Sequence, residues 1–161
     1  VQDEENQLYL LDTTGEEIWK KQLDGAILGP VHQVDLYRNK RLQLAFTTDK
    51  SFQVLDRNGN PVSGYNKKGM RTSSTLGIFD YDNQRNYRLV LSSGNTLSMY
   101  DRSMKKVSGW RKTKLKSALK YPPKHIRIGN RDYIALVQKS GKENCYTARE
   151  KHVSKYQQTQ S

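Results

Sequence analysis

The sequence predicts an all-β protein in which short antiparallel strands, grouped four at a time, form units that recur about every 45 residues. Three observations predict this class. Similar segments end at aspartates 44 and then 45 residues apart: Asp12, Asp56 and Asp101. A second set of apolar segments recurs with spacings of 45 and 46 residues: 42–46, 87–91 and 133–137. No segment keeps a 3.6-residue apolar period over a helical length.

The strands of the first unit are expected at residues 7–12, 16–22, 31–36 and 41–47. Alternation of apolar and polar residues supports the last of these, where Leu42, Leu44 and Phe46 share one face. Asp-x-x-Gly turns end at Gly15 and Gly59, because Asp caps such a turn and Gly tolerates a positive φ. In the third unit methionine stands where glycine is expected, so we expect a different turn geometry there.

Four strands every 40–45 residues are typical of a blade of a β-propeller. The units are expected at residues 1–40, 41–85 and 86–131, with the start of a fourth from 132. Propellers typically have four to eight blades. Three units and a fraction therefore predict an incomplete β-propeller that belongs to a longer protein and self-associates through its exposed terminal blades.

Two segments depart from this pattern. Residues 112–121 come nearest to a helical period and are followed by Pro122 and Pro123, which leaves a short helical turn or a loop open. By the period, 142–147 should be an apolar strand ending in Asp, but it reads Lys-Glu-Asn-Cys-Tyr-Thr. A reading-frame slip near Gly141 and a polar tail both explain this departure. On either interpretation 144–161 is expected to pack poorly.

The composition excludes several classes of protein. The chain has 161 residues, 34% of them hydrophobic, and a mean hydropathy of −0.91, so no window supplies the ~20 apolar residues of a membrane span. Ten Tyr, three Phe and two Trp argue against wholesale disorder. The single cysteine, Cys145, excludes an internal disulfide and a zinc site of paired cysteines. His32, His125 and His152 form no i,i+4 ligand pair.

Positive charge is concentrated in the second part of the chain. Residues 1–60 hold seven Lys/Arg against ten Asp/Glu, a net charge of −3, whereas 61–161 hold 21 against six, a net of +15. The stretch 105–124 has eight cations and no acid: Lys105, Lys106, Arg111, Lys112, Lys114, Lys116, Lys120 and Lys124. Such an excess favours polyanionic partners such as nucleic acid, phospholipid headgroups or acidic glycans.

The repeat resembles two families of propeller blade. Residues 8–19, Leu-Tyr-Leu-Leu-Asp-Thr-Thr-Gly-Glu-Glu-Ile-Trp, resemble the quinoprotein-type (PQQ-like) repeat, which ends in a docking tryptophan, here Trp19. Residues 35–56 and 80–101 look more like the integrin-type repeat. The composite, over about residues 7–140, is similar to propeller regions of large exported bacterial proteins. This resemblance implies a periplasmic or cell-envelope location and leaves function open.

Neither family's chemical site is expected in this chain. A quinone cofactor sits on the axis of a complete ring, which three units do not supply. The integrin-type loop binds calcium through alternate oxygens, and Asp80, Asp82 and Gln84 provide three of them. Arg85 replaces the loop glycine and Arg88 the final ligand, so the sequence favours solvated turn carboxylates that pair with these arginines. We therefore expect no cofactor and no metal.

The candidate binding residues are the basic stretch and its tryptophan: Lys105, Lys106, Trp110, Arg111, Lys112, Lys114, Lys116 and Lys120. Lysines near Trp110 and Tyr121 would bind phosphates and stack bases or sugars. Alternatively, Trp110 fills a packing position of the repeat, as Tyr65 does after Gly64, and the lysines line a solvated loop.

The chain contains no catalytic triad, P-loop or dinucleotide fingerprint. We therefore expect a non-catalytic β-propeller module for binding or scaffolding, with a protein or polyanion as partner. Two alternatives stay open: a section of a propeller enzyme whose active site lies in other blades, and a basic domain that binds polyanions through residues 105–124.

Overall fold

The computed structural model describes residues 1–68, 76–108, 110, 113–141 and 143–147. These residues form β-strands and turns and contain no helix, which confirms the all-β class. The first sheet pairs β1 (Gln7–Leu11) with β2 (Glu17–Gln22). The later sheets contain, in order, β3 (His32–Val34), β4 (Gln43–Thr47), β5 (Ser51–Leu55) and β6 (Lys67–Lys68); β7 (Gly77–Phe79), β8 (Arg88–Ser93), β9 (Thr96–Asp101) and β10 (Thr113–Lys114); and β11 (Lys124–Ile128), β12 (Arg131–Val137) and β13 (Glu143–Thr147).

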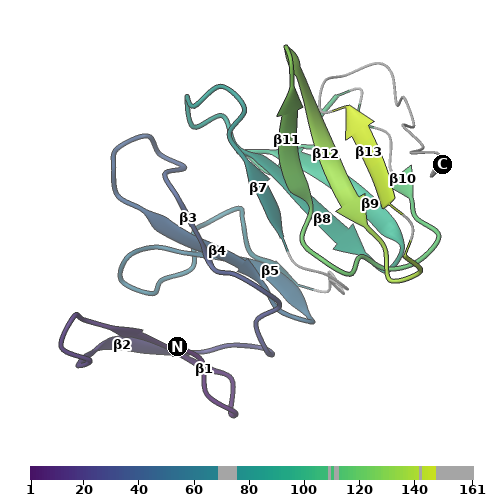
Figure 1. The fold of residues 1–161 in the computed structure, drawn as a ribbon. Coiled ribbons are helices and arrows are strands. Elements are labelled where there is room, and N and C mark those ends of the chain that lie inside the picture. The colour runs from purple at the N-terminus through teal and green to yellow at the C-terminus, as the bar shows by residue number, and fades with distance from the viewer. Residues whose placement is uncertain (69–75, 109, 111–112, 142, 148–161) are drawn as a thin grey trace.

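Every strand pair is antiparallel, and within each sheet the strands lie side by side in chain order. The four sheets follow one another in chain order, from the purple N-terminal pair to the yellow C-terminal strand (Figure 1). The four strands expected in residues 7–47 are therefore present. They belong to two sheets, however, because 7–22 pair with each other whereas β3 and β4 join β5 and β6. The first four-stranded sheet therefore begins two strands later than the first unit predicted from the sequence.

Three separate apolar clusters lie between consecutive sheets. The first joins Leu8 and Leu23 to Phe46 and Leu55 of the second sheet. The second cluster contains side chains from β3–β5 and from β8, together with Leu36, Val62 and Leu76. The third contains side chains from β7–β9 and β12, together with Leu115 and Leu119. Each sheet is therefore stabilised by its neighbours along the chain.

The three aspartate turns share one geometry. The Asp12 carboxylate accepts backbone N–H bonds from the second and fourth residues after it, at 2.8 and 2.9 Å, and Asp56 and Asp101 accept the corresponding pairs at 2.8 to 3.0 Å. The third turn residue has positive φ in each case: 89° at Gly15, 80° at Gly59 and 59° at Met104. The expectation of a different geometry at Met104 is wrong, because the methionine adopts the left-handed conformation and keeps the hydrogen bonds of Asp101.

The two departing segments also take defined courses. Thr113–Lys114 are strand β10, and 115–121 form bends and an isolated bridge without a helical turn. Near the C-terminus, Glu143–Thr147 pair with β12 over five residues. Backbone pairing thus extends four residues into the segment expected to pack poorly, and 148–161 lie outside the described residues.

Candidate functional site

The lysines of the basic stretch are exposed wherever the structure describes them. Lys105 and Lys106 lie in the turn after β9, and Lys114 belongs to β10. Lys116 and Lys120 lie in the loop between β10 and β11. Arg111 and Lys112 lie outside the described residues. The ammonium groups of the described lysines are therefore accessible to a ligand.

Buried neighbours hold this loop in place. Leu115 and Leu119 insert into the third apolar cluster, at 5% and 2% exposure, and the lysine that follows each of them, Lys116 and Lys120, is exposed to solvent. The buried Gln138 side-chain oxygen accepts the backbone N–H of Lys116 at 2.8 Å and the next N–H at 3.0 Å. The backbone N–H of Lys139 in turn donates to a loop carbonyl at 2.8 Å. Lys139 is exposed and extends the basic surface by a residue that the sequence analysis did not include.

The two aromatic residues of the stretch have different roles. Trp110 is partly buried and packs against the third cluster, and Tyr65 packs in the same way against the second. The indole N–H of Trp110 is buried and finds no acceptor among the described residues. Tyr121 is 51% exposed, and the Lys120 ammonium lies 5.3 Å from its ring centroid. Tyr121, rather than Trp110, is therefore the accessible stacking surface.

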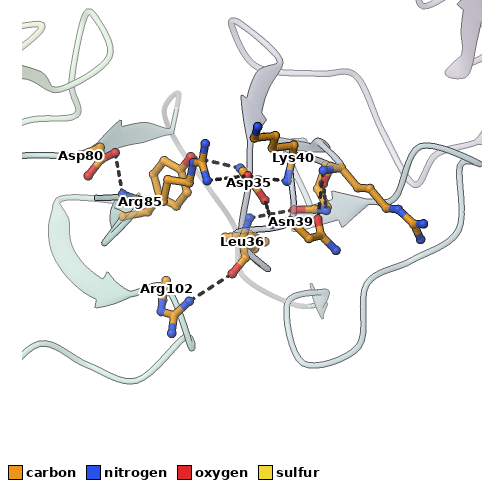
Figure 2. A network of polar contacts seen from close by, with 10 residues as sticks. Asp35, Leu36, Asn39, Lys40, Asp80, Arg85 and Arg102 are labelled. Carbon is orange, nitrogen blue, oxygen red and sulfur yellow. Dashed lines mark hydrogen bonds and ion pairs between the residues drawn. The ribbon is translucent and has the colours of Figure 1, made fainter. Parts of the chain in front are cut away.

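A buried carboxylate joins the second and third sheets. Asp35 is 3% exposed, and its oxygens accept the backbone N–H groups of Asn39 at 3.0 Å and Lys40 at 2.9 Å. Arg85, from the loop between β7 and β8, adds an ion pair at 3.3 Å (Figure 2). Arg102 donates to the Leu36 carbonyl at 3.3 Å from the turn after β9. Asp35 is thus part of a contact between the second and third sheets.

The corresponding loop of the third sheet is built in the same way but has fewer partners. Asp80 accepts the backbone N–H of Arg85 at 2.9 Å, as Asp35 accepts that of Lys40. Its other oxygen is buried and has no hydrogen-bond partner within the described residues. Asp82 is exposed and accepts from the next loop residues. In both loops the first aspartate therefore accepts the backbone N–H of the fifth residue after it.

Aromatic side chains dock the first and second sheets onto the aspartate turn of the next sheet. The Trp19 indole N–H donates to the Arg57 carbonyl at 2.9 Å. One repeat later the Tyr65 hydroxyl donates to the Arg102 carbonyl. Both acceptors directly follow the turn aspartate, so the two docking contacts are equivalent.

Glycine at position 59 is required by this docking. A Cβ added to Gly59 would lie 3.0 Å from the Trp19 ring, whereas one added to Gly15 meets nothing within 4 Å. Both residues have positive φ, so Gly15→Ala is expected to cost about 1 kcal/mol through backbone strain alone. Gly59→Ala is expected to cost at least about 1 kcal/mol more, because the tryptophan must move. Urea unfolding of both variants measures the difference, and equal losses would contradict the docking contact.

A polar cluster joins the third and fourth sheets. Asp132 on β12 is 3% exposed and accepts from His125 Nε2 at 2.8 Å and from Arg127 Nε at 2.7 Å. Arg127 also donates to the Tyr81 carbonyl at 2.7 Å, and the Tyr81 ring packs edge-on against His125. Burial raises the pKa of the Tyr81 hydroxyl, so this phenol stays protonated at neutral pH.

The Asp132 cluster makes the free energy of unfolding depend on pH in the acid range. The hydrogen bond from Arg127 lowers the pKa of Asp132 below its usual value, and the bond from His125 acts in the same direction. A carboxylate with a lowered folded-state pKa stabilises the fold above its unfolded pKa of about 3.9 and loses this contribution as the pH falls through the folded-state pKa. Asp132→Asn is therefore expected to be less stable at pH 7 and to show a flatter decline below about pH 4. Arg127→Gln should shift the decline to higher pH, and unfolding curves from pH 7 to pH 2 measure both effects.

An open hollow of about 390 Å³ lies near the first sheet, between the loop that precedes β4 and the aspartate turn that follows β5. Its lining combines an aromatic ring, two arginines and several amides: Tyr37, Asn39, Arg41, Leu42, Gln43, Asp56, Arg57 and Asn58. The Asp56 carboxylate is occupied by its own turn. The lining holds two arginines against this one carboxylate, a net charge of +1.

Clusters of potential metal ligands and membrane-spanning helices are both absent from the described part of the chain. It holds no group of three His, Cys, Asp or Glu side chains arranged around a common point. None of its segments is a helix long and apolar enough to cross a membrane.

The sequence predicted the basic stretch but not the intersheet contacts. The pairing of Asp35 with Arg85 joins side chains 50 residues apart, and the signal for it is the recurrence of Asp35 at Asp80 and of Lys40 at Arg85.

Comparison with known protein families, curated proteins and solved structures finds no match to the chain.

Proposed function

We propose that the chain is a section of a β-propeller in a larger exported bacterial protein and that it acts as a non-catalytic scaffold for binding. The observation that carries this proposal is the equivalence of successive intersheet contacts. Trp19 and Tyr65 bond the same position of two consecutive aspartate turns, and apolar clusters fill the spaces between sheets. Stacked sheets with repeating contacts are the construction principle of propellers.

The outer sheets support the assignment to a section. Large apolar side chains are exposed at both ends of the array: Leu11 and Ile18 on the first sheet, Ile126 and Ile128 on β11. Exposed apolar groups of this kind favour association. We therefore propose that the isolated chain self-associates through its terminal sheets.

Sedimentation velocity over a range of protein concentrations tests the proposal. Association is expected to weaken in Ile18→Lys and Ile128→Lys. Val31→Lys, at an exposed apolar position before β3, serves as the matched control and should associate like the unaltered chain. A monomeric chain with one sharp thermal transition would argue against a section of a longer array.

A second candidate function is polyanion binding by the basic loop. The favouring observation is that Lys116 and Lys120 are exposed on the loop fixed by Gln138, with the accessible ring of Tyr121 beside Lys120. Lys114 on β10 and Lys139 after β12 are exposed at the two ends of the contact with this loop. Binding of this kind weakens with salt because counterions are released.

Heparin and single-stranded DNA affinity test this candidate function. Serine at Lys114, Lys116 and Lys120 together should lower retention strongly. The matched variant carries serine at Lys20, Lys50 and Arg131, which removes the same charge from exposed positions elsewhere. Equal losses in the two triple variants would show that net charge, not this loop, binds the polyanion.

A further inference from the structure

The hollow near the first sheet has unused binding groups. Arg41 and Arg57 are exposed, and their side chains have no hydrogen-bond or ion-pair partner within the described residues. Leu42, between them in the lining, is 44% exposed, although it begins an apolar segment of the repeat.

One repeat later, the side chains at the equivalent positions bind the acidic loop of the second sheet. The Tyr87 hydroxyl accepts the backbone N–H of Asp35 at 3.1 Å, and Arg102 donates to the Leu36 carbonyl at 3.3 Å. Arg85 pairs with the Asp35 carboxylate at 3.3 Å. The third sheet thus binds the acidic loop of the second through a hydroxyl and two guanidinium groups (Figure 2).

The lining of the hollow includes two of the three equivalent positions, and no loop of the described residues fills it. The residues 45 positions before Tyr87 and Arg102 are Leu42 and Arg57. The residue 45 positions before Arg85, whose guanidinium pairs with the Asp35 carboxylate, is Lys40. Leu42 and Arg57 both line the hollow. An aspartate-containing loop offers the carboxylate and carbonyl oxygens that these cations lack.

Among the described residues, only residues 1–3 pair with the outer edge of β1. The backbone N–H of Tyr9 donates to the Val1 carbonyl at 2.7 Å, and the amino group of Val1 donates to the Tyr9 carbonyl at 3.0 Å. In the second sheet the equivalent edge of β5 pairs with β4. The first sheet therefore corresponds to the last two strands of a four-stranded sheet.

We propose that the β1 edge and the hollow together bind a β-hairpin of the same repeat type, which precedes β1 in the array and inserts its aspartate loop between Leu42 and Arg57. This inference rests on the proposed propeller section and adds the identity of the partner: two strands joined by a loop that begins with Asp.

A graft onto the full chain tests the proposal. A copy of residues 30–46, which contains β3, its acidic loop and most of β4, replaces Val1 and Gln2 and is joined directly to Asp3. Hydrogen exchange of the backbone N–H groups of β1 is expected to slow by about tenfold or more, because an edge strand becomes an inner strand. A graft with Asp35→Ala in the copied segment should lose most of this protection.

Variants of the host chain locate the contact. In the grafted protein, Arg57→Ser should remove the protection, whereas Lys50→Ser, an exposed cation of the same sheet, should retain it. Unchanged exchange on grafting, or equal effects of the two variants, would overturn the proposal. Dimers of the ungrafted chain that dissociate on Arg57→Ser would also overturn it, since a second copy would then cover the hollow. If the graft does not slow exchange but Ile18→Lys still weakens self-association, this inference fails while the proposed propeller section stands.

Discussion

Replacing Ile134 by alanine is expected to lower the free energy of unfolding by about 2 to 5 kcal/mol. Ile134 is 0% exposed on β12 and packs in the cluster between the third and fourth sheets. Removing its three outer carbons both loses transfer free energy and leaves a cavity that neighbouring strands, fixed by hydrogen bonds, cannot close. Urea unfolding monitored by circular dichroism measures the change.

Ile128→Ala is the matched control. Ile128 lies at the end of β11, which pairs with β12, and is 62% exposed. Its truncation should change the free energy of unfolding by no more than about 1 kcal/mol, mainly through lower β-propensity. Losses of similar size at the two positions would contradict the burial of Ile134 between two sheets.

Asp35→Ala is expected to lower the free energy of unfolding by about 2 to 3 kcal/mol. The substitution leaves the backbone N–H groups of Asn39 and Lys40 without their acceptor in a site where the carboxylate is 4% exposed. The ion pair with Arg85 adds little, since that side chain is 41% exposed and its charge is screened by solvent.

Asp82→Ala in the next repeat provides the comparison. Asp82 also accepts a backbone N–H in its loop, at 3.0 Å from Gln84, but its carboxylate is exposed and water can replace it. Asp82→Ala should therefore lower the free energy of unfolding clearly less than Asp35→Ala does. Hydrogen exchange of the loop amides adds a second measurement, in which only Asp35→Ala should expose the N–H of Lys40.

Strand positions were predictable because period and alternation are local properties of the sequence. The segments expected at 42–46, 87–91 and 133–137 all lie within or overlap strands. Sheet membership was not predictable, because the turn between two strands looks alike whether it joins strands of one sheet or leads to the next. The strict alternation expected around Leu44 also fails: Gln43 and Ala45 are buried as well as Phe46, because the sheet has neighbours on both faces.

The candidate site was predictable only as far as charge reveals it. A run of cations without acids indicated a basic surface, and the structure exposes Lys114 on β10 and Lys116 and Lys120 in the loop that follows it. The buried state of Asp35 was not predictable from its own surroundings in the sequence, which are polar. Its burial depends on Arg85, 50 residues away, and on the neighbouring sheet that carries it.

The separation of the apolar core into three clusters has a consequence for cooperativity. Because each cluster joins only consecutive sheets, the free energy of folding divides into nearest-neighbour terms, as in a one-dimensional lattice. Unfolding then begins at the ends of the lattice, where a sheet has one neighbour, and proceeds inward one boundary at a time. A substitution that weakens one boundary should therefore also broaden or split the unfolding transition, because the sheets on the two sides of that boundary then unfold more independently.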